Sequence, residues 1–184
     1  LRGGSNVSKK LLEIKDERLS FFTPAGEVKA LNGVSFSMDE GDVLGIVGES
    51  GSGKSVTAYS IMGLTAYPGK LIGGTVEFNG HEIHNMTEKE FRKIRGNEVS
   101  IIFQDPMTSL NPVYTIEDQI VEGILLHTDK TKAQAHERAK ELLELVGINE
   151  PEKRLKQYPH ELSGGMRQRG MIALALACEP TLLI

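Results

Sequence analysis

Residues 43–55 read VLGIVGESGSGKS, and this stretch decides how the rest of the chain is interpreted. Positions 43–47 are continuously apolar, which is typical of a strand buried on both faces of a parallel sheet. Positions 48–55 follow the pattern G-x-x-x-x-G-K-[ST], and a helical pattern extends from Lys54 to about position 64. Strand, glycine-rich loop and helix in this order predict a phosphate-binding loop. The alternative is an ordinary glycine-rich turn before a helix.

The chemistry of such a loop depends on its backbone. Glycines let the chain curl so that successive N–H groups point at phosphate oxygens, and the positive end of the following helix strengthens the field. Lys54 is expected to reach the β and γ phosphates of a nucleotide, and Ser55 to hold Mg²⁺. The residues expected to bind the nucleotide here are Gly48, Glu49, Ser50, Gly51, Ser52, Gly53, Lys54, Ser55 and Val56. The loop alone does not distinguish a kinase, a GTPase, a motor or a transporter.

Length and charge exclude several other classes of protein. A chain of 184 residues can form one domain with a substantial core. The net charge of −4 provides no long-range attraction to nucleic acid, so no nucleic-acid partner is expected. The longest apolar run, 171–178, is too short to cross a bilayer. The single cysteine, Cys178, lies in that run and is expected to be a buried small hydrophobe in a reducing compartment.

The remaining patterns alternate strands and helices. Residues 1–8 are polar and glycine-rich, which indicates a flexible tail or a remnant of an expression vector. Asn79-Gly80 lies between alternating residues and predicts a hairpin turn. Gly147 suits a left-handed cap after a helix. The other expected elements are antiparallel strands within 11–39, a hairpin over 75–83, a buried strand at 99–103, helices over 116–126, 131–146 and 163–178, and a strand beginning at 181–184.

A second motif, LSGGMRQR, occupies residues 162–169 at another predicted helix N-terminus. Ser163 is a good helix cap, and taken alone the motif needs no further role. Together with the phosphate loop it resembles the ATP-binding cassette (ABC) family, whose signature is an LSGGQ-like sequence. The family also has a glutamine at the end of an intervening strand, and Gln104 follows the strand predicted at 99–103. The departure is Met166, where the family most often has glutamine.

The resemblance implies an α/β fold of the P-loop NTPase type, with an antiparallel β-subdomain and a helical subdomain. The boundaries it suggests are about 9–103 for the β-subdomain and phosphate-loop core, 104–160 for the helical subdomain, and 161–184 for the signature helix and the next strand. It also implies two subunits arranged head to tail. ATP is then held between the loop of one subunit and Ser163, Gly164 and Gly165 of the other, while Gln104 contacts Mg²⁺ and the attacking water.

Two further segments resemble importers of oligopeptides, dipeptides and nickel. They are FQDPMTSLNP at 103–112, for which a capped turn is the alternative, and YPHEL at 158–162. In that family the first segment faces the membrane subunit. Phe21 is the expected adenine-stacking residue, although Phe22 is also possible and both can simply pack in the β-subdomain. His160 is expected to have a positional or capping role.

The implied partners are a second ATPase subunit, integral membrane permease subunits and, indirectly, an extracytoplasmic solute-binding protein, at the cytoplasmic face of the cell membrane. Relatives carry an aspartate and a catalytic glutamate just after the position of Ile184, so the sequence predicts a truncated ATPase that binds ATP without hydrolysing it. The alternatives are an ABC ATPase of DNA repair or translation, and a module that only captures nucleotide.

Overall fold

The computed structural model describes residues 9–105 and 109–184. The chain forms two compact units, one up to Phe91 and one from Arg92 onward. The elements of the first unit are β1 (Lys10–Thr23), β2 (Gly26–Asp39), α1 (Lys54–Ile61), β3 (Gly69–Phe78), β4 (His81–Glu82), a 3₁₀ turn (Ile83–Asn85) and the start of α2 (Glu88–Ile94). Those of the second are β5 (Val99–Ser100), α4 (Ile116–His127), α5 (Lys132–Leu145), α6 (Pro151–Leu155), a 3₁₀ turn (Pro159–Glu161), α7 (Gly164–Ala175) and β6 (Leu182–Leu183).

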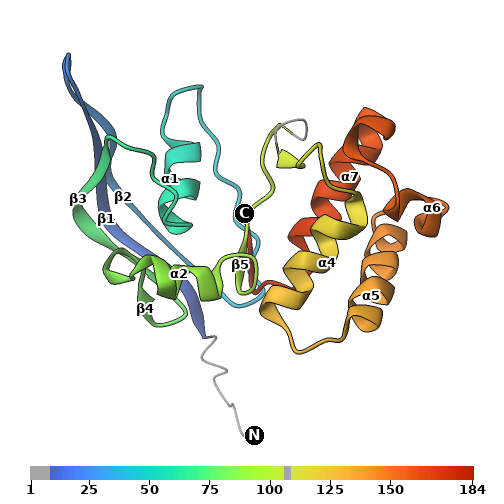
Figure 1. The fold of residues 1–184 in the computed structure, drawn as a ribbon. Helices are drawn as coiled ribbons and strands as arrows, with labels where there is room; N and C mark the ends of the chain where they lie inside the picture. The colour runs from blue at the N-terminus through green and yellow to red at the C-terminus, as the bar shows by residue number, and fades with distance from the viewer. Residues whose placement is uncertain (1–8, 106–108) are drawn as a thin grey trace, which may run out of the picture. The chain divides into compact units, whose positions relative to one another are not determined.

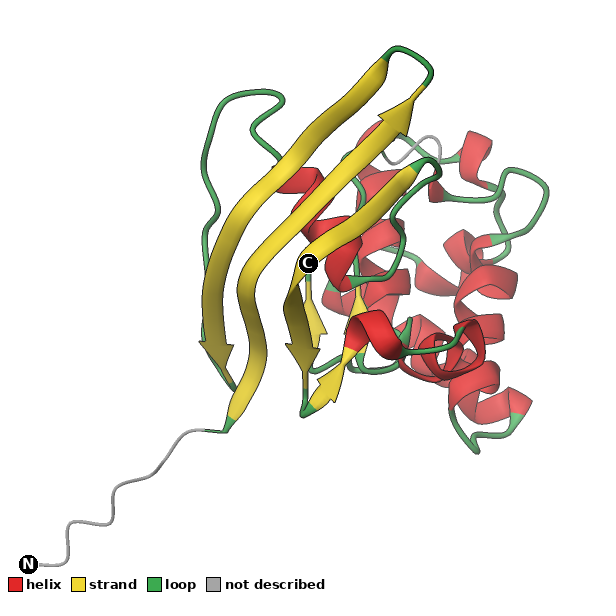
Figure 2. Ribbon diagram, turned by 90° about the vertical axis from the view of Figure 1, so that its left-hand side faces the viewer, coloured by secondary structure: helices red, strands yellow, loops and turns green. Residues whose placement is uncertain are grey.

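The first unit is built on an antiparallel sheet with the strand order β2-β1-β3-β4, seen face-on as the long yellow strands of Figure 2. The hairpin predicted at Asn79-Gly80 is confirmed: Phe78 pairs with His81, and both turn residues have positive φ (49° and 81°). Leu12, Ile14 and Leu19 of β1 are each 1% exposed and form part of its core. The expected antiparallel β-subdomain is therefore present.

The second unit is a helical cluster, in which α4, α5, α6 and α7 surround one apolar core (Figure 1). Thr115 and Thr131 begin α4 and α5 with capping boxes, in which the threonine hydroxyl accepts from the third helical N–H and that residue's side chain accepts from the threonine N–H. Gly147 follows α5 with φ 76°, as a left-handed cap requires. The helices lie where the sequence predicts them because their caps are encoded locally.

The prediction of a strand at 43–47 is wrong. These residues form no strand and pair with no described residue, and Val43 and Val47 are 99% and 93% exposed. An apolar run shows that a segment can be buried, but a parallel strand also needs neighbours from distant parts of the chain. The parallel ladder in the described residues joins β5 and β6 instead.

The strand predicted at 99–103 is shorter than expected. Only Val99 and Ser100 are assigned to β5, which pairs with Leu182 and Leu183 of β6. The contact continues for one more step, because Ile102 N–H donates to the Ile184 carbonyl at 2.8 Å and Ile184 N–H donates to Ser100 at 2.9 Å. No helix among the described residues is both long and apolar enough to cross a membrane.

Candidate nucleotide-binding site

The phosphate loop lies in the first unit, directly before α1. The Lys54 ammonium folds back over the loop and donates to the carbonyl oxygens of Gly48 and Glu49, both at 2.7 Å, and to Ser52 Oγ at 3.4 Å. The positive charge is thus held at the centre of the loop. The N–H groups of the first turn of α1 have no acceptor within the helix, so they add further donors at the same place.

Glycine is required in this loop for two different reasons. Gly51 and Gly53 have φ of 81° and 93°, a conformation that other residues rarely adopt. A Cβ at Gly53 would also lie 2.8 Å from Leu31 Cδ2 and 2.9 Å from the Ala30 carbonyl oxygen, so the loop passes close to β2. A Cβ at Gly48 would lie 2.6 Å from Ser52 Oγ. The loop therefore takes a curled shape with a narrow interior.

This geometry fits the triphosphate of a nucleotide. The curled backbone, the central ammonium and the helix N-terminus together supply the donors and the positive charge that phosphate oxygens need. Ser55 is exposed at the start of α1, so its hydroxyl is accessible to a Mg²⁺ ion. Glu49 and Ser50 are exposed and Val56 is half-buried. The structure therefore brings the predicted loop residues together in one place.

Phe21 and Phe22 lie at the end of β1, where it pairs with both β2 and β3. Phe22 is 45% exposed, whereas Phe21 is half-buried and lies close to Gly69, at which an added Cβ would be 2.8 Å from Phe21 Cε1. Phe21 therefore packs against β3, and Phe22 is the more accessible ring. The choice between them as the adenine-stacking residue stays a prediction.

The second motif lies in the other unit, at the N-terminus of α7. Ser163 is the N-cap, and its hydroxyl accepts from the Met166 N–H at 3.3 Å. Gly164 and Gly165 form the exposed first turn, and an added Cβ at either would meet nothing within 4 Å. The N-terminus of this helix is thus open to an anionic ligand.

The remaining residues that the sequence singles out in the second unit lie at separate places along the chain. Gln104 is exposed in the loop after β5. In the segment predicted to face a membrane subunit, residues 106–108 lie outside the described residues. His160 stacks on Tyr158 with ring centroids 5.7 Å apart, in the short turn before Ser163. Cys178 is half-buried, and burial raises the pKa of its thiol, as expected of an unreactive cysteine.

Comparison with known proteins identifies the family. The ABC transporter family profile matches residues 31–184. This chain belongs to the ABC transporter family. Its relatives include the oligopeptide transport ATP-binding protein OppD of Escherichia coli, 54% identical over 174 residues that make up 95% of this chain and 51% of OppD. The dipeptide transport ATP-binding protein DppD of Escherichia coli is 50% identical over 97% of this chain and 53% of its own length.

Solved structures agree with that assignment. A dimeric ATP-binding cassette in a post-hydrolysis state, bound to ADP and Pi, has a TM-score of 0.84 and 26% identity, covering 94% of this chain and 72% of that one. The α/β cassette fold expected from the sequence is thereby confirmed. The chain spans about half the length of the curated relatives that it matches.

Sequence reasoning missed two features of this ABC family chain. Glu17 is a fully buried carboxyl group in β1, and a set of basic residues from α2 and α4 lines a cavity in the second unit. Neither could be found from motifs. Glu17 lies in a segment that looks like a simple alternating strand, and the basic residues are brought together only by the fold.

Proposed function

We propose that this chain is the nucleotide-binding part of an ATPase subunit that powers the import of peptides or related small solutes. The observation that carries the proposal is the phosphate loop, in which Lys54 is held over a glycine-curled backbone at the N-terminus of α1. The similarity to oligopeptide and dipeptide transport ATP-binding proteins supports peptides as the transported class.

The residues of the loop have separate roles in this proposal. The N–H groups of 48–56 bind phosphate oxygens, Lys54 neutralises the β and γ phosphates, and Ser55 holds Mg²⁺. Mg²⁺ neutralises charge on the phosphates during their transfer. Phe21 or Phe22 stacks on the adenine, and Gln104 contacts Mg²⁺ and orients the attacking water. No step needs a side chain to act as a strong base at the loop itself.

The proposed working unit is a head-to-tail pair of subunits. Ser163, Gly164 and Gly165 present a capped helix N-terminus with exposed N–H groups, which suits the phosphates held by the loop of the second subunit. The dimeric state of the solved cassette bound to ADP and Pi supports the pairing of two subunits. Nucleotide binding closes the pair, and hydrolysis releases it, so the energy of ATP becomes a movement passed to the membrane subunits.

The segment after Gln104 is the proposed contact with the permease. Val113 and Tyr114, which directly follow that segment, are 72% and 52% exposed, and two adjacent exposed apolar side chains suit a contact with a partner protein. The solute-binding protein then acts only indirectly, through the permease, and the chain itself works at the cytoplasmic face of the membrane.

Co-purification with the membrane subunits of a peptide importer tests this function. We expect the tagged chain to retain those subunits, and the double change Val113→Ser and Tyr114→Ser to abolish retention while ATP binding persists. Leu145→Ser is the matched control, because Leu145 is 69% exposed on α5 in the same unit. If neither the tagged chain nor the Leu145→Ser control retains the membrane subunits, and nucleic acid stimulates the ATPase activity, the transport function is contradicted. A cassette of DNA repair or translation would then be favoured.

A further inference from the structure

The side chain of Gln119, in the first turn of α4, holds the loop that leads into this helix. Its Oε1 accepts from the Asn111 N–H at 2.9 Å, and its Nε2 donates to the Asn111 carbonyl at 3.0 Å. The same amide also donates to the carbonyl oxygens of Tyr114 at 3.1 Å and Thr115 at 3.3 Å. One carboxamide thus binds both backbone groups of Asn111 and ties residues 111–115 to the helix.

These bonds are not part of the helix cap. Thr115 and Asp118 already form the capping box of α4, in which the side chain of each accepts from the backbone N–H of the other. A cap supplies acceptors for the free N–H groups of the first turn, whereas Gln119 donates to carbonyl oxygens that precede the helix. The start of α4 therefore does not depend on Gln119, and its bonds serve the loop.

The base of the loop is fixed in the core of the second unit. Ile116 and Ile120, which flank Gln119 in α4, are each 1% exposed and belong to the apolar cluster of this unit. The Ile116 N–H also donates to the Gln157 carbonyl at 3.0 Å, which joins the start of α4 to the segment that leads to Ser163. Gln119 is thus anchored, and the loop that it binds is anchored with it.

The loop presents two apolar side chains to solvent, because Val113 and Tyr114 are 72% and 52% exposed. The Val113 N–H donates to Asn111 Oδ1 at 3.2 Å, so the backbone from Asn111 to Tyr114 is held along its length. Ordering a loop on binding costs free energy, and a loop that is ordered beforehand avoids this cost. The bonds of Gln119 therefore favour an apolar surface that is ready for a partner.

We propose that Gln119 is a positioning residue, which holds 111–115 in the conformation that the membrane subunits of the importer bind. This inference rests on the proposed function, in which Val113 and Tyr114 contact those subunits. Gln119 is half-buried and acts through the loop. When its carboxamide is removed, the loop is released, and the membrane subunits must then order it as they bind.

Amide hydrogen exchange of the free chain tests the first part of the proposal. The Asn111 amide belongs to an exposed residue, yet it should exchange at least about tenfold more slowly than in an unfolded chain, because Gln119 accepts its proton. Gln119→Met removes the amide donor and acceptor at similar side-chain length and should abolish this protection. Gln134→Met is the matched control, since Gln134 makes similar bonds to Thr131 at the start of α5. An unprotected Asn111 amide in the unchanged chain would overturn the proposal.

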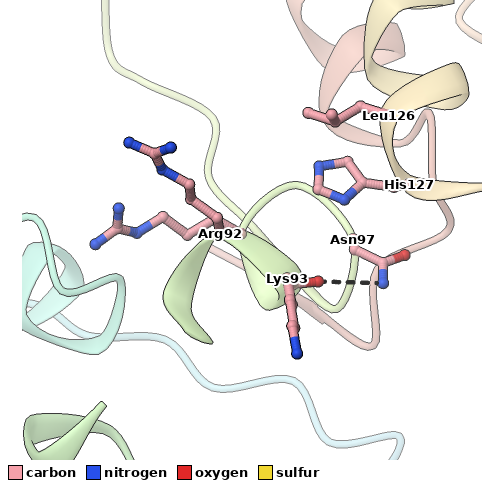
Figure 3. Close-up of a pocket in the computed structure, with 6 residues that line it drawn as sticks. Arg92, Lys93, Asn97, Leu126 and His127 are labelled. Carbon is pink, nitrogen blue, oxygen red and sulfur yellow. Dashed lines mark hydrogen bonds between the residues drawn. The ribbon is translucent and has the colours of Figure 1, made fainter. Parts of the chain in front are cut away.

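Titration with the membrane subunits of a peptide importer tests the second part. Gln119→Met should raise the dissociation constant for these subunits about tenfold or more, and change that for ATP by less than about twofold. Gln134→Met should lose stability through the cap of α5 but bind the membrane subunits as the unchanged chain does. Leu126→Ser should also leave binding unchanged, because it removes a comparably exposed apolar side chain from the other end of α4, beside the cavity in Figure 3.

The outcomes separate this inference from the proposed function. If the unchanged chain does not bind the membrane subunits, the proposed contact fails and the role of Gln119 fails with it. If the unchanged chain binds and Gln119→Met binds equally well, only the role of Gln119 is overturned. Equal weakening by Gln119→Met and Gln134→Met would also overturn it, because a general loss of stability would then be the cause. Thermal unfolding verifies the fold of each variant, and the exchange of Asn111 in the unchanged chain needs no variant.

Discussion

Glu17 is a carboxylic acid in the middle of β1 that is fully buried. Neither of its oxygens has a hydrogen-bond partner among the described residues, and the buried hydroxyl of Ser20, which is also in β1, has none either. Burial raises the pKa of Glu17, and the nearby Ser60 hydroxyl moderates that rise while donating its own bond to the Thr57 carbonyl at 2.8 Å. Burial thus favours the neutral form of the Glu17 carboxyl group.

Glu17 makes the first unit depend on pH. Because its folded pKa lies above the unfolded value, its favourable contribution is complete below about pH 4.3 and is lost as pH rises through the folded pKa. Glu17→Leu should therefore stabilise the unit at pH 7 by about 1–3 kcal/mol, with little gain at pH 4. Thermal unfolding of both proteins at the two pH values measures this. An equal effect at both would show that ionisation is not the cause.

Gly53 is the second residue whose identity the structure explains. Gly53→Ala should cost about 1–2 kcal/mol for the left-handed backbone alone, and the clash with Leu31 and Ala30 adds to it. Gly45→Ala is the control, since an added Cβ there meets nothing within 4 Å. Chemical denaturation should show a loss only for Gly53→Ala. Equal losses in both variants would mean that the close approach of the loop to β2 is not significant.

At the scale of elements, the cap of α7 and its proposed phosphate contact can be separated. Ser163→Ala removes the acceptor of the Met166 N–H and should destabilise the second unit by about 1 kcal/mol, whereas Ser163→Asp should preserve the cap. Both should weaken nucleotide-driven pairing of subunits, the aspartate by charge repulsion. Thermal unfolding and sedimentation velocity with ATP report on the two effects. Normal pairing by the aspartate variant would exclude an anion site at this helix end.

His136 connects α5 to two neighbouring helices. Its Nδ1 lies 2.7 Å from Glu117 Oε1 of α4, and its Nε2 lies 3.4 Å from Glu152 Oε2 of α6. Glu152 also pairs with Lys140 at 3.2 Å, and Lys140 lies near Glu137. The hydrogen bond with Glu117 is the main reason that the pKa of His136 is raised.

This cluster predicts a second dependence on pH, in the second unit. Because the folded pKa of His136 is raised, its stabilising contribution is complete below about pH 6.5 and is lost as pH rises through the folded pKa. His136→Gln should remove a contribution of less than about 1 kcal/mol, since the groups are partly exposed. Unfolding followed at pH 6 and pH 9 tests this, and a difference that is the same at both would refute the ionic explanation.

The elements also show how far the sequence alone can predict the fold. Helices α4, α5 and α7 follow from caps and spacing, which are local. The conformation of segment 43–47 does not follow from local spacing, because a parallel strand needs partner strands that no local pattern supplies. Glu17 escapes prediction because the register of β1 shifts between Ile14 and Glu17, so a polar residue takes an inward position.

At the scale of the molecule, the two halves of the proposed site lie in separate units of the chain. The phosphate loop with Lys54 belongs to the first unit, and Gln104 and Ser163 belong to the second. Each motif is a short local pattern, so the residues of the proposed site can be named from the sequence alone. Their assembly around one nucleotide depends on a second subunit and on long-range contacts, and is therefore part of the proposal.

Equilibrium binding of ATP with Mg²⁺, compared between this chain and Lys54→Ala, tests whether the loop at 48–55 holds the phosphates. We predict that the chain binds and that the variant binds about 10- to 100-fold more weakly, because the ammonium at the centre of the loop is lost. Lys132→Ala, a surface lysine of the second unit, should bind as the unchanged chain does. Equal affinity of the chain and Lys54→Ala would contradict the assignment of this loop as the phosphate site.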